Sequence, residues 1–307
     1  MDGILNINKP TGMTSHDVVA KIRKILTQKR VGHAGTLDPA ASGVLPICIG
    51  QGTRIAEYLS KSGKAYQADI VFGIVTDTYD SEGSIIRTAS AADLTLPRIE
   101  ATLQQFLGTQ MQQPPRYSAI KIQGQPAYKR ARAGEELSLA ARPITITSLE
   151  ILAWNNPHLT IAIACSKGTY IRSLAYDLGE RLACGAHLAG LIRTRSGPFT
   201  LSESITLEQL AAAASSGTIA EHLYSPDIAL QSYPALQLDA ATAAHVLHGN
   251  PFPYNLTPST TSPTLARVYA PNNNFLAIAE WCPGQNLWQP KKVFTIQALH
   301  PPAEKYP

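Results

Sequence analysis

The sequence predicts an α+β protein with a mixed, mostly antiparallel sheet, followed by a small C-terminal β-barrel. In the first part of the chain, strand-like and helix-like segments occur without the strict alternation that a parallel sheet requires. After about residue 227 the charge falls, and short strand candidates follow one another between prolines. We therefore expect two domains, residues 1–227 and 235–307.

The N-terminal elements follow from apolar spacing. Residues 4–7 form a short apolar strand that ends before Pro10. A helix is expected next, because the apolar residues recur at helical spacing: Val18, Val19, Ile22, Ile25 and Leu26. Thr14 or Ser15, just before them, can cap this helix. Residues 30–46 are rich in glycine and proline and predict an ordered, irregular loop. A short helix is expected near residues 53–59.

In the middle of the chain, the residues of one face alternate with those of the other over 64–72, as in a half-buried strand. Residues 76–83 are acidic and predict a turn. A helix is expected over 97–107. Strands are expected over 142–152 and 159–165, the second apolar enough to be central. Residues 169–182 predict a strong helix with one apolar face, made of Ile171, Leu174, Ala175, Leu178 and Leu182. Beyond residue 227, the strand candidates are 235–238, 265–269, 275–281 and 292–299.

Composition narrows the function classes. The net charge is +4: residues 1–200 carry 22 Lys and Arg against 15 Asp and Glu, and residues 201–307 carry 4 against 7. The basic excess thus lies where a polyanion would be attracted. No apolar stretch is long enough for a bilayer, and no secretory signal is visible, so we expect a cytoplasmic protein without membrane contact. The four cysteines lack metal or disulfide spacing and are expected to be reduced and mostly buried.

Asp38 is the first candidate for chemistry. It lies in a Gly-rich segment, Gly32–Pro46, and Pro39 biases it toward an extended backbone. The loop can therefore present one carboxylate, although an ordinary turn explains an isolated Asp-Pro equally well. The glycines do not match a Walker phosphate loop.

A second cluster, Lys167–Arg172, flanks a predicted helix start, where an anion is favoured. Arg172 can pair with a carboxylate and keep it ionised, or form a surface salt bridge. Three tyrosines lie near basic residues: Tyr66, Tyr117 and Tyr128. Tyrosine rings can stack on bases while the basic residues bind phosphates. The eight histidines have no metal spacing, and only His33, between two glycines near Asp38, is of interest. From these residues alone, the sequence predicts an RNA-suited α+β domain with one presented Asp.

Taken together, the clusters resemble the TruB family of tRNA pseudouridine(55) synthases over nearly the full length. Five stretches in family order carry the resemblance: Gly3–Pro10, Gly32–Pro46, Lys64–Gly83, Gln113–Lys121 and Cys165–Gly197. The resemblance implies a pseudouridine-synthase fold and a PUA-like RNA-binding domain at the C-terminus. It also implies isomerisation of uridine 55 in the T-loop of tRNA, by base flipping and without a cofactor or metal.

Residue roles follow from the same resemblance. Asp38, in a G-T-L-D-P motif, is implied as the catalytic nucleophile. Tyr66 matches a tyrosine that stacks on the target base, and Arg172, in G-T-Y-I-R, is expected to pair with Asp38. The implied substrate-binding residues are Lys9, His33, Tyr66, Tyr170, Leu191 and Arg193. Asp80 is expected to support the residues that contact the substrate. Arg193 follows Ile192, a position that is often basic in the family.

The implied chemistry agrees with these residue types. The target base must leave its stack, and an Asp in a water-poor pocket can attack C1′ or C6, or stabilise charge on the ribose. We expect a monomer that binds the T-arm of tRNA and needs no protein partner. Three alternatives remain: a non-catalytic RNA-binding protein, a guide-RNA-dependent relative, and a hydrolytic nucleosidase.

Overall fold

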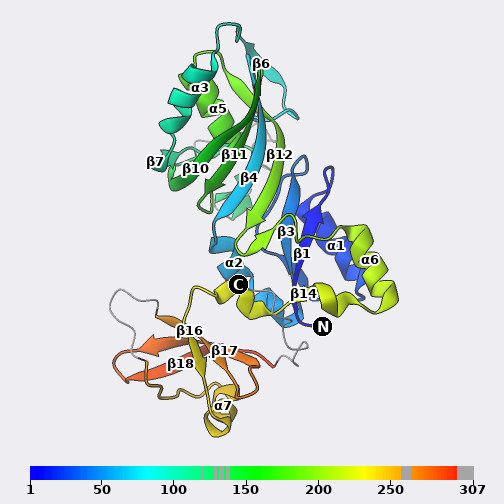
Figure 1. Ribbon diagram of the computed structural model, residues 1–307, viewed down its shortest axis with the longest axis vertical. Helices are drawn as coiled ribbons and strands as arrows, with labels where there is room; N and C mark the ends of the chain where they lie inside the picture. Colours follow the sequence, from blue (N-terminus) through cyan, green and yellow to red (C-terminus); the bar gives the residue numbers. More distant parts are fainter. Residues whose placement is uncertain are drawn as a thin grey trace.

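A ten-stranded sheet runs through the upper two-thirds of the molecule (Figure 1). The computed structural model describes residues 1–118, 120–122, 124–127, 130, 135, 139–256 and 264–295. In spatial order, the main path of the sheet is β14 (Leu223–Tyr224), β1 (Gly3–Lys9), β3 (Ser42–Ile49), β12 (Ala186–Ser196), β4 (Lys64–Phe72), β11 (His158–Cys165), β10 (Arg142–Asn155) and β7 (Gly108–Gln112). Strand β2 (Val31–His33) pairs with β3, and β13 (Phe199–Thr200) pairs with β12. Every neighbouring pair is antiparallel except β3–β12, which confirms the predicted α+β class and the mostly antiparallel sheet.

The parallel pair β3–β12 is a narrow junction between two half-sheets. The first half-sheet consists of β14, β1, β3 and β2, and the second of β12, β13, β4, β11, β10 and β7. The junction consists of only two residue pairs, Ile192 with Ser42 and Arg193 with Gly43. Gly43 has a φ of 100°, and a Cβ at this position would lie 2.3 Å from the carbonyl oxygen of Arg193. Glycine is therefore required at the point where the two strands approach each other.

The first half-sheet is buried on both faces, which explains why β1 and β3 are apolar at nearly every position. Leu45 and Ile47 face helices α1 (Ser15–Ile25) and α6 (Leu207–Ser216), whereas Val44 and Cys48 belong to the core on the opposite face. Thr14 caps α1 in a capping box with Asp17, as one of the two predicted caps.

The second half-sheet packs against α3 (Leu96–Gln104) and α5 (Ile171–Arg181), which lie on one side of it in Figure 1. The predicted apolar face of α5 is buried in this core at all five positions: Ile171, Leu174, Ala175, Leu178 and Leu182. Strand β4 has the predicted bounds, and β11 is indeed an interior strand. Smaller elements connect the sheet: η1 (Gly50–Ile55), α2 (Ala56–Lys61), β5 (Ile74–Thr76), β6 (Ile85–Thr88), β8 (Lys121–Ile122), β9 (Gln125–Pro126), η2 (Ile219–His222) and η3 (Pro226–Leu230).

The prediction that residues 30–46 form one irregular loop was too broad. Strand β2 begins at Val31 and β3 at Ser42, so only the segment 34–41 is irregular. Pro46 is tolerated inside β3 because β2 ends at His33. The Pro46 carbonyl accepts a hydrogen bond from the amide of Ala34, and no strand continues opposite the position where proline lacks an amide hydrogen.

The described residues of the C-terminal region form an open sheet and no closed barrel. Among the described residues it has the order β15 (Ala235–Gln237), β16 (Leu265–Tyr269), β17 (Phe275–Cys282) and β18 (Leu287–Val293), with α7 (Ala240–Leu247) packed against it. Closure would require β15 to pair with β18. Instead, Phe252 forms an isolated bridge with Trp288 of β18. The strand expected at 292–299 begins five residues earlier, and residues 296–299 lie outside the described part.

The C-terminal sheet shares a core with the first half-sheet, across the boundary predicted between residues 227 and 235. Phe275 and Phe294 belong to the same apolar cluster as Ile4, Cys48 and Ile55. We call this shared cluster the seam. The ammonium of Lys292 donates to the carbonyl of Arg54 at 2.7 Å, which adds a polar bond beside the seam.

Two predictions from composition can be compared with the structure. All four cysteines are free, and Cys48, Cys165 and Cys184 are buried, as expected. No helix in the described part of the chain is long and apolar enough to cross a membrane.

Candidate active site

Asp38 lies in the irregular segment 34–41, and its two neighbours are anchored by hydrogen bonds. The hydroxyl of Ser15 donates to the carbonyl of Leu37 at 3.2 Å and accepts from the amide of Leu37 at 2.9 Å. The carbonyl of Pro39 accepts from the amide of Gly12 at 2.9 Å and from the ammonium of Lys9 at 3.3 Å. The backbone around Asp38 is thus fixed, while its side chain remains 46% exposed.

Arg172 binds two carboxylates at once. Its Nη2 lies 3.1 Å from Oδ2 of Asp38, so the expected pair is present, and its Nη1 lies 3.2 Å from Oδ2 of Asp80. Nη2 also donates to the carbonyl of Tyr117 at 2.9 Å, and Nη1 to that of Thr78 at 3.4 Å. The Arg172 side chain is only 8% exposed, so these contacts hold the guanidinium in one orientation.

Asp80 is held by the turn between β5 and β6. Its Oδ1 accepts from the hydroxyl of Thr78 at 2.6 Å and from the amide of Glu82 at 3.1 Å. Its backbone carbonyl accepts from the hydroxyl of Thr76 at 2.6 Å. Asp80 therefore offers one oxygen to Arg172 while the other is bound within the turn.

Tyr66 and Arg193 are directly opposite each other on β4 and β12. Burial raises the pKa of the Tyr66 phenol, and the nearby guanidinium of Arg193 opposes this rise. The phenol therefore keeps its proton at neutral pH. It can stack or donate a hydrogen bond, but it does not start as a phenolate base.

Arg193 points into the protein and is 1% exposed. Its guanidinium donates to three backbone carbonyls, those of Val44 at 2.7 Å, Gly35 at 3.1 Å and Thr36 at 3.3 Å. Burial lowers the pKa of this group. Arg193 thus binds β3 to the start of the irregular segment, and its guanidinium does not lie at the surface, where the substrate-binding role implied for it would require it to be.

Lys9 is completely buried and has a similar arrangement. Its ammonium donates to the carbonyls of Met13 at 2.6 Å, Pro10 at 2.8 Å and Pro39 at 3.3 Å. Burial lowers the pKa of Lys9 to about 8, and the charge of Asp38 opposes this shift. Neither Lys9 nor Arg193 reaches the surface, so both hold the Asp38 segment from within.

Tyr170 is the residue before α5, and the side chain of Gln112 binds both its amide and its carbonyl. The Gln112 side chain accepts from the Tyr170 amide at 2.8 Å and donates to its carbonyl at 3.0 Å. Burial raises the pKa of the Tyr170 phenol, which lies beside Ser118. These two hydrogen bonds hold the first turn of α5, and with it Arg172, against β7.

His33 ends β2 and packs edge to face against His16, with ring centroids 5.3 Å apart. Burial lowers the pKa of His33, so the imidazole is neutral at physiological pH. Tyr117 contributes its carbonyl rather than its ring to the contacts of Arg172. Tyr128 lies outside the described residues.

A narrow cavity lies beside the Arg172 cluster. Its lining combines the ionisable residues Asp38, Asp80 and Arg172 with a wall of β12 and a few small residues: Leu188, Ala189, Gly190, Leu191, Ala40, Ala41 and Ser81. Tyr66, Tyr170 and His33 are not part of this lining. The cavity holds about 20 Å³, room for about one water molecule, so a base could enter only if lining side chains move apart.

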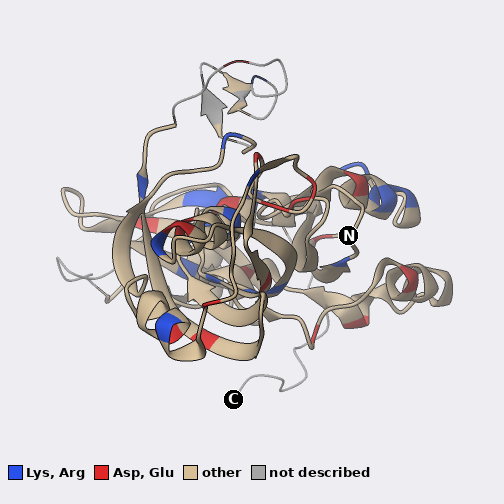
Figure 2. Cartoon of the chain, turned by 90° about the horizontal axis from the view of Figure 1, so that it is seen from above, with Lys and Arg blue, Asp and Glu red and all other residues tan. Residues whose placement is uncertain are grey.

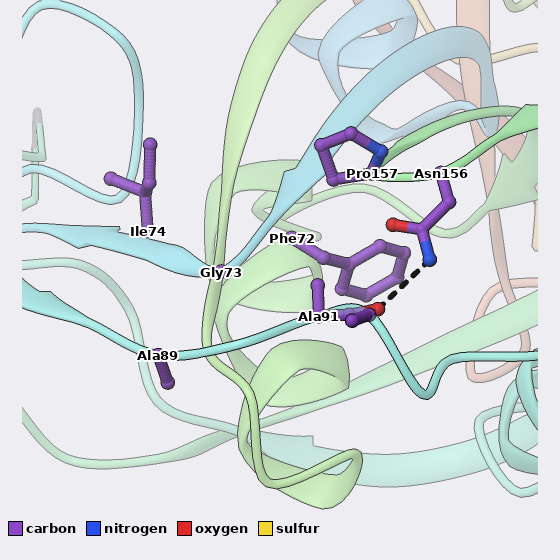
Figure 3. Close-up of a pocket in the computed structure, with 8 residues that line it drawn as sticks. Phe72, Gly73, Ile74, Ala89, Ala91, Asn156 and Pro157 are labelled. Atoms are coloured by element: carbon purple, nitrogen blue, oxygen red, sulfur yellow. Dashed lines mark hydrogen bonds between the residues drawn. The ribbon is translucent and has the colours of Figure 1, made fainter.

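A second cavity, of about 290 Å³, lies at the far end of β4 (Figure 3). The ring of Phe72 forms part of it, and the Asn156 amide donates to the carbonyl of Ala91 at 2.9 Å. None of its lining residues is ionisable. It therefore offers no acid, base or nucleophile, and the chemistry-bearing residues belong to the cavity beside Asp38.

Charges of both signs are interspersed through the body of the molecule (Figure 2). Within the described residues, no group of three or more His, Cys, Asp and Glu side chains could hold a metal ion. The sequence did not single out two contributors to the site. Ser15 was considered only as a helix cap, and Gln112 precedes a recognisable motif; only the folded backbone shows that they hold Leu37 and Tyr170.

Comparison with protein families gives two adjacent matches. Residues 23–171 match the model described as TruB family pseudouridylate synthase (N terminal domain). Residues 172–231 match the model described as tRNA pseudouridylate synthase B C-terminal domain.

Curated relatives agree with these matches. A tRNA pseudouridine synthase B of Dehalococcoides mccartyi is 43% identical over 303 residues, which are 99% of this chain and 100% of the relative. A protein of the same name from Gloeobacter violaceus is 48% identical, over 82% of this chain and 87% of the relative.

Solved structures with a similar fold include chains of H/ACA complexes. One chain, in an H/ACA RNP bound to a substrate RNA containing 2′-deoxyuridine, is 25% identical with a TM-score of 0.74, over 97% of this chain and 87% of that chain. Another, in an archaeal box H/ACA sRNP Nop10–Cbf5 complex, is 26% identical with a TM-score of 0.72, over 97% and 88%.

Proposed function

The chain belongs to the TruB family of pseudouridylate synthases, isomerases that act on tRNA, and on this premise we propose that it converts uridine 55 of the T-loop to pseudouridine with Asp38 as nucleophile. The observation that carries the proposal is the Asp38–Arg172–Asp80 cluster beside a cavity walled by Leu191. One carboxylate of this cluster is half exposed and the other is held within a turn, so only Asp38 is free to reach a substrate.

In this reaction the bond from N1 to C1′ breaks and a bond from C5 to C1′ forms. The proton on C5 leaves and N1 gains a proton, so the overall change needs neither an oxidant nor a second substrate. Asp38 attacks the flipped-out nucleotide at C1′, where it displaces the uracil and bonds to the ribose, or at C6, where it bonds to the uracil. In either case the other fragment stays in the site, and the bond to Asp38 breaks again once C5 has joined C1′. Arg172 fixes the direction of the attacking carboxylate.

Tyr66 and Leu191 hold the base in this proposal. They lie two residues apart in the register of β4 and β12, since Leu191 pairs with Ala68 and Arg193 with Tyr66. Because burial raises its pKa and keeps the phenol protonated, Tyr66 acts as a neutral ring that stacks on uracil and not as the base that starts the reaction. Tyr170 and His33 contact the RNA around the flipped nucleotide.

Substrate binding must open the site. The present cavity has room for about one water molecule, and a pyrimidine ring is much larger. Opening is easiest at Asp38, whose side chain is the most exposed of the three ionisable groups lining the cavity. A base that enters there also excludes water from the Asp38–Arg172 pair, which strengthens its electrostatic effect.

We further propose that the chain acts as a monomer on bare tRNA, and that its C-terminal sheet contacts the RNA. The structural neighbours are chains of an H/ACA RNP and of an H/ACA sRNP Nop10–Cbf5 complex, so the purified chain alone is the informative preparation. The experiment incubates it with an unmodified tRNA transcript, and with a transcript carrying cytidine in place of uridine 55, and then maps pseudouridine.

We expect product at position 55 with the first transcript and none with the second. Product only after addition of a guide RNA would favour the guide-dependent alternative, and release of free uracil would indicate a nucleosidase. Tight tRNA binding without product would leave an RNA-binding protein as the correct description.

A further inference from the structure

The turn that carries Asp80 contains an unusual backbone. Tyr79, directly before Asp80, has a φ of 64°, a left-handed conformation that residues other than glycine rarely adopt. The carbonyl of Tyr79 accepts from the amide of Leu188 at 3.0 Å, so this conformation also joins the turn to β12. A residue with a side chain persists in such a conformation only where its surroundings hold it.

The surroundings that hold Tyr79 come from α5. Its ring stacks on the ring of Tyr176, with centroids 4.1 Å apart and an interplanar angle of 20°. Tyr176 is four residues beyond Arg172, hence one helical turn along the same face of α5. A single helix thus presents Arg172 to the carboxylate of Asp80 and Tyr176 to the ring of the preceding residue.

We propose that the Tyr79–Tyr176 stack sets the position of Asp80 on Arg172, and through it the direction in which Arg172 offers Asp38 to the substrate. Both tyrosines are positioning residues in this arrangement. The inference rests on the proposed function of Asp38 and adds to it a part of the site that lies outside the cavity lining.

The geometry explains why a flat ring is needed. Asp80 has one oxygen on Thr78 and Glu82 within its own turn, so it shifts as a unit with that turn. Without the stack, the turn can relax at Tyr79 and withdraw the other oxygen from Arg172. Arg172 would then pair with Asp38 alone. This stronger pair would turn the Asp38 carboxylate away from the direction in which it attacks the substrate.

The test compares steady-state kinetics of Tyr176→Leu and Tyr176→Phe on unmodified tRNA transcript. Leucine retains apolar volume without a flat ring, whereas phenylalanine retains the ring. We expect Tyr176→Leu to lower kcat by about 10- to 100-fold with KM close to that of the wild type, and Tyr176→Phe to remain near the wild type. A rise in KM with kcat unchanged would instead mean that the rings bind RNA, and would overturn the inference.

Two further variants separate the possible causes. Tyr79→Gly accepts the left-handed backbone without strain but lacks the ring, so we expect it to lose kcat as Tyr176→Leu does. Full activity of Tyr79→Gly would show that the backbone conformation suffices without the stack. In the Asp80→Asn background, Tyr176→Leu should cause little additional loss, since both changes act through one contact. Additive losses would contradict the proposal.

The matched control is Tyr233→Ala, which removes an edge-to-face pair with Tyr58 near the C-terminal sheet, with centroids 6.3 Å apart. It should lower Tm without changing kcat. If Tyr233→Ala lowers kcat as much as Tyr176→Leu, the loss reflects general destabilisation and the inference fails. A wild type that makes no pseudouridine would overturn the proposed function, and this inference with it; a wild type with normal product and an equally active Tyr176→Leu would overturn the inference alone.

Discussion

The Asp38 segment is partly exposed and the seam under the C-terminal sheet is buried, and the two regions are held by opposite means. Around Asp38, the ammonium of Lys9 and the guanidinium of Arg193 donate to six backbone carbonyls from inside the protein. At the seam, Phe275 and Phe294 pack on apolar residues of the first half-sheet. Hydrogen bonds to charged groups fix direction but require desolvation, whereas apolar packing supplies free energy without direction.

This difference predicts how the two regions respond to mutation. Changes around Asp38 should lower activity, because they misdirect the nucleophile, and should lower stability as well where they remove buried hydrogen bonds. Changes at the seam should alter stability more than activity. The following predictions run from the largest expected effect on activity to the smallest.

Asp38→Asn should reduce pseudouridine formation by at least about 1,000-fold, because the amide lacks the nucleophilic oxygen. Stability should change little: the Asp38 side chain is 46% exposed, and such a partly exposed ion pair is worth at most about 1 kcal/mol. The measurements are a single-turnover assay on tRNA transcript and a thermal melt, with tRNA binding as the control for folding. Near-normal activity of this variant would remove Asp38 from the mechanism.

Arg193→Met should lower kcat by about 100-fold and the free energy of unfolding by about 3 kcal/mol. The carbonyls of Gly35, Thr36 and Val44 lose their donors, and the start of the Asp38 segment is released. Urea unfolding gives the stability, and kinetics well below the transition give the activity. Arg193→Lys is the control, since one ammonium cannot serve all three carbonyls and an intermediate loss is expected. Normal kcat in a folded Arg193→Met protein would show that these bonds do not direct Asp38.

Lys9→Met should lower kcat only about tenfold, because the carbonyl of Pro39 keeps its bond from the amide of Gly12. Its effect on stability depends on pH. Burial lowers the pKa of Lys9 from 10.5 to about 8, so above pH 8 the folded protein loses this proton while the unfolded chain retains it. Stability of the wild type should therefore rise relative to Lys9→Met, by about 2 kcal/mol between pH 7 and pH 9.5.

Urea unfolding of both proteins at the two pH values checks this difference. Lys64, whose pKa burial likewise lowers to about 8, is present in both and cancels in the comparison. A stability gap that does not depend on pH would mean that Lys9 is not charged and buried as the structure has it.

The sequence predicted what depends on local pattern. The apolar face of α5, the bounds of β4 and the mixed sheet all follow from side-chain periodicity. It also placed Asp38 in a stiff loop and paired it with Arg172, through motif resemblance.

What the sequence did not predict depends on contacts between distant segments. Strand β12 contains Gly190, which weakens a strand pattern, and we predicted no strand there; β3 and β4 on either side nevertheless make it one. The inward direction of Lys9 and Arg193 is not visible from residue type, since lysine and arginine are rarely buried. The expected barrel is not seen among the described residues for a similar reason: four short strands can be counted from the sequence, but closure depends on whether the outer two meet.

Phe294→Ala is the variant that best isolates the seam. Phe294 is completely buried, and the guanidinium of Arg54 lies 4.9 Å from its ring centroid. Removing the ring leaves a cavity and should lower the free energy of unfolding by about 3–5 kcal/mol. Because no hydrogen bond to the Asp38 segment changes, kcat should stay within about twofold of the wild type at temperatures where the variant is folded.

Urea unfolding gives the free energy of unfolding, and kinetics on tRNA transcript give kcat. Far-UV circular dichroism establishes the temperatures at which the variant is folded. A large fall in kcat in the folded variant would contradict the separation of the two regions. It would mean that the seam, through β1 and β3, also sets the direction of Asp38, and that apolar packing contributes to positioning at this distance from the site.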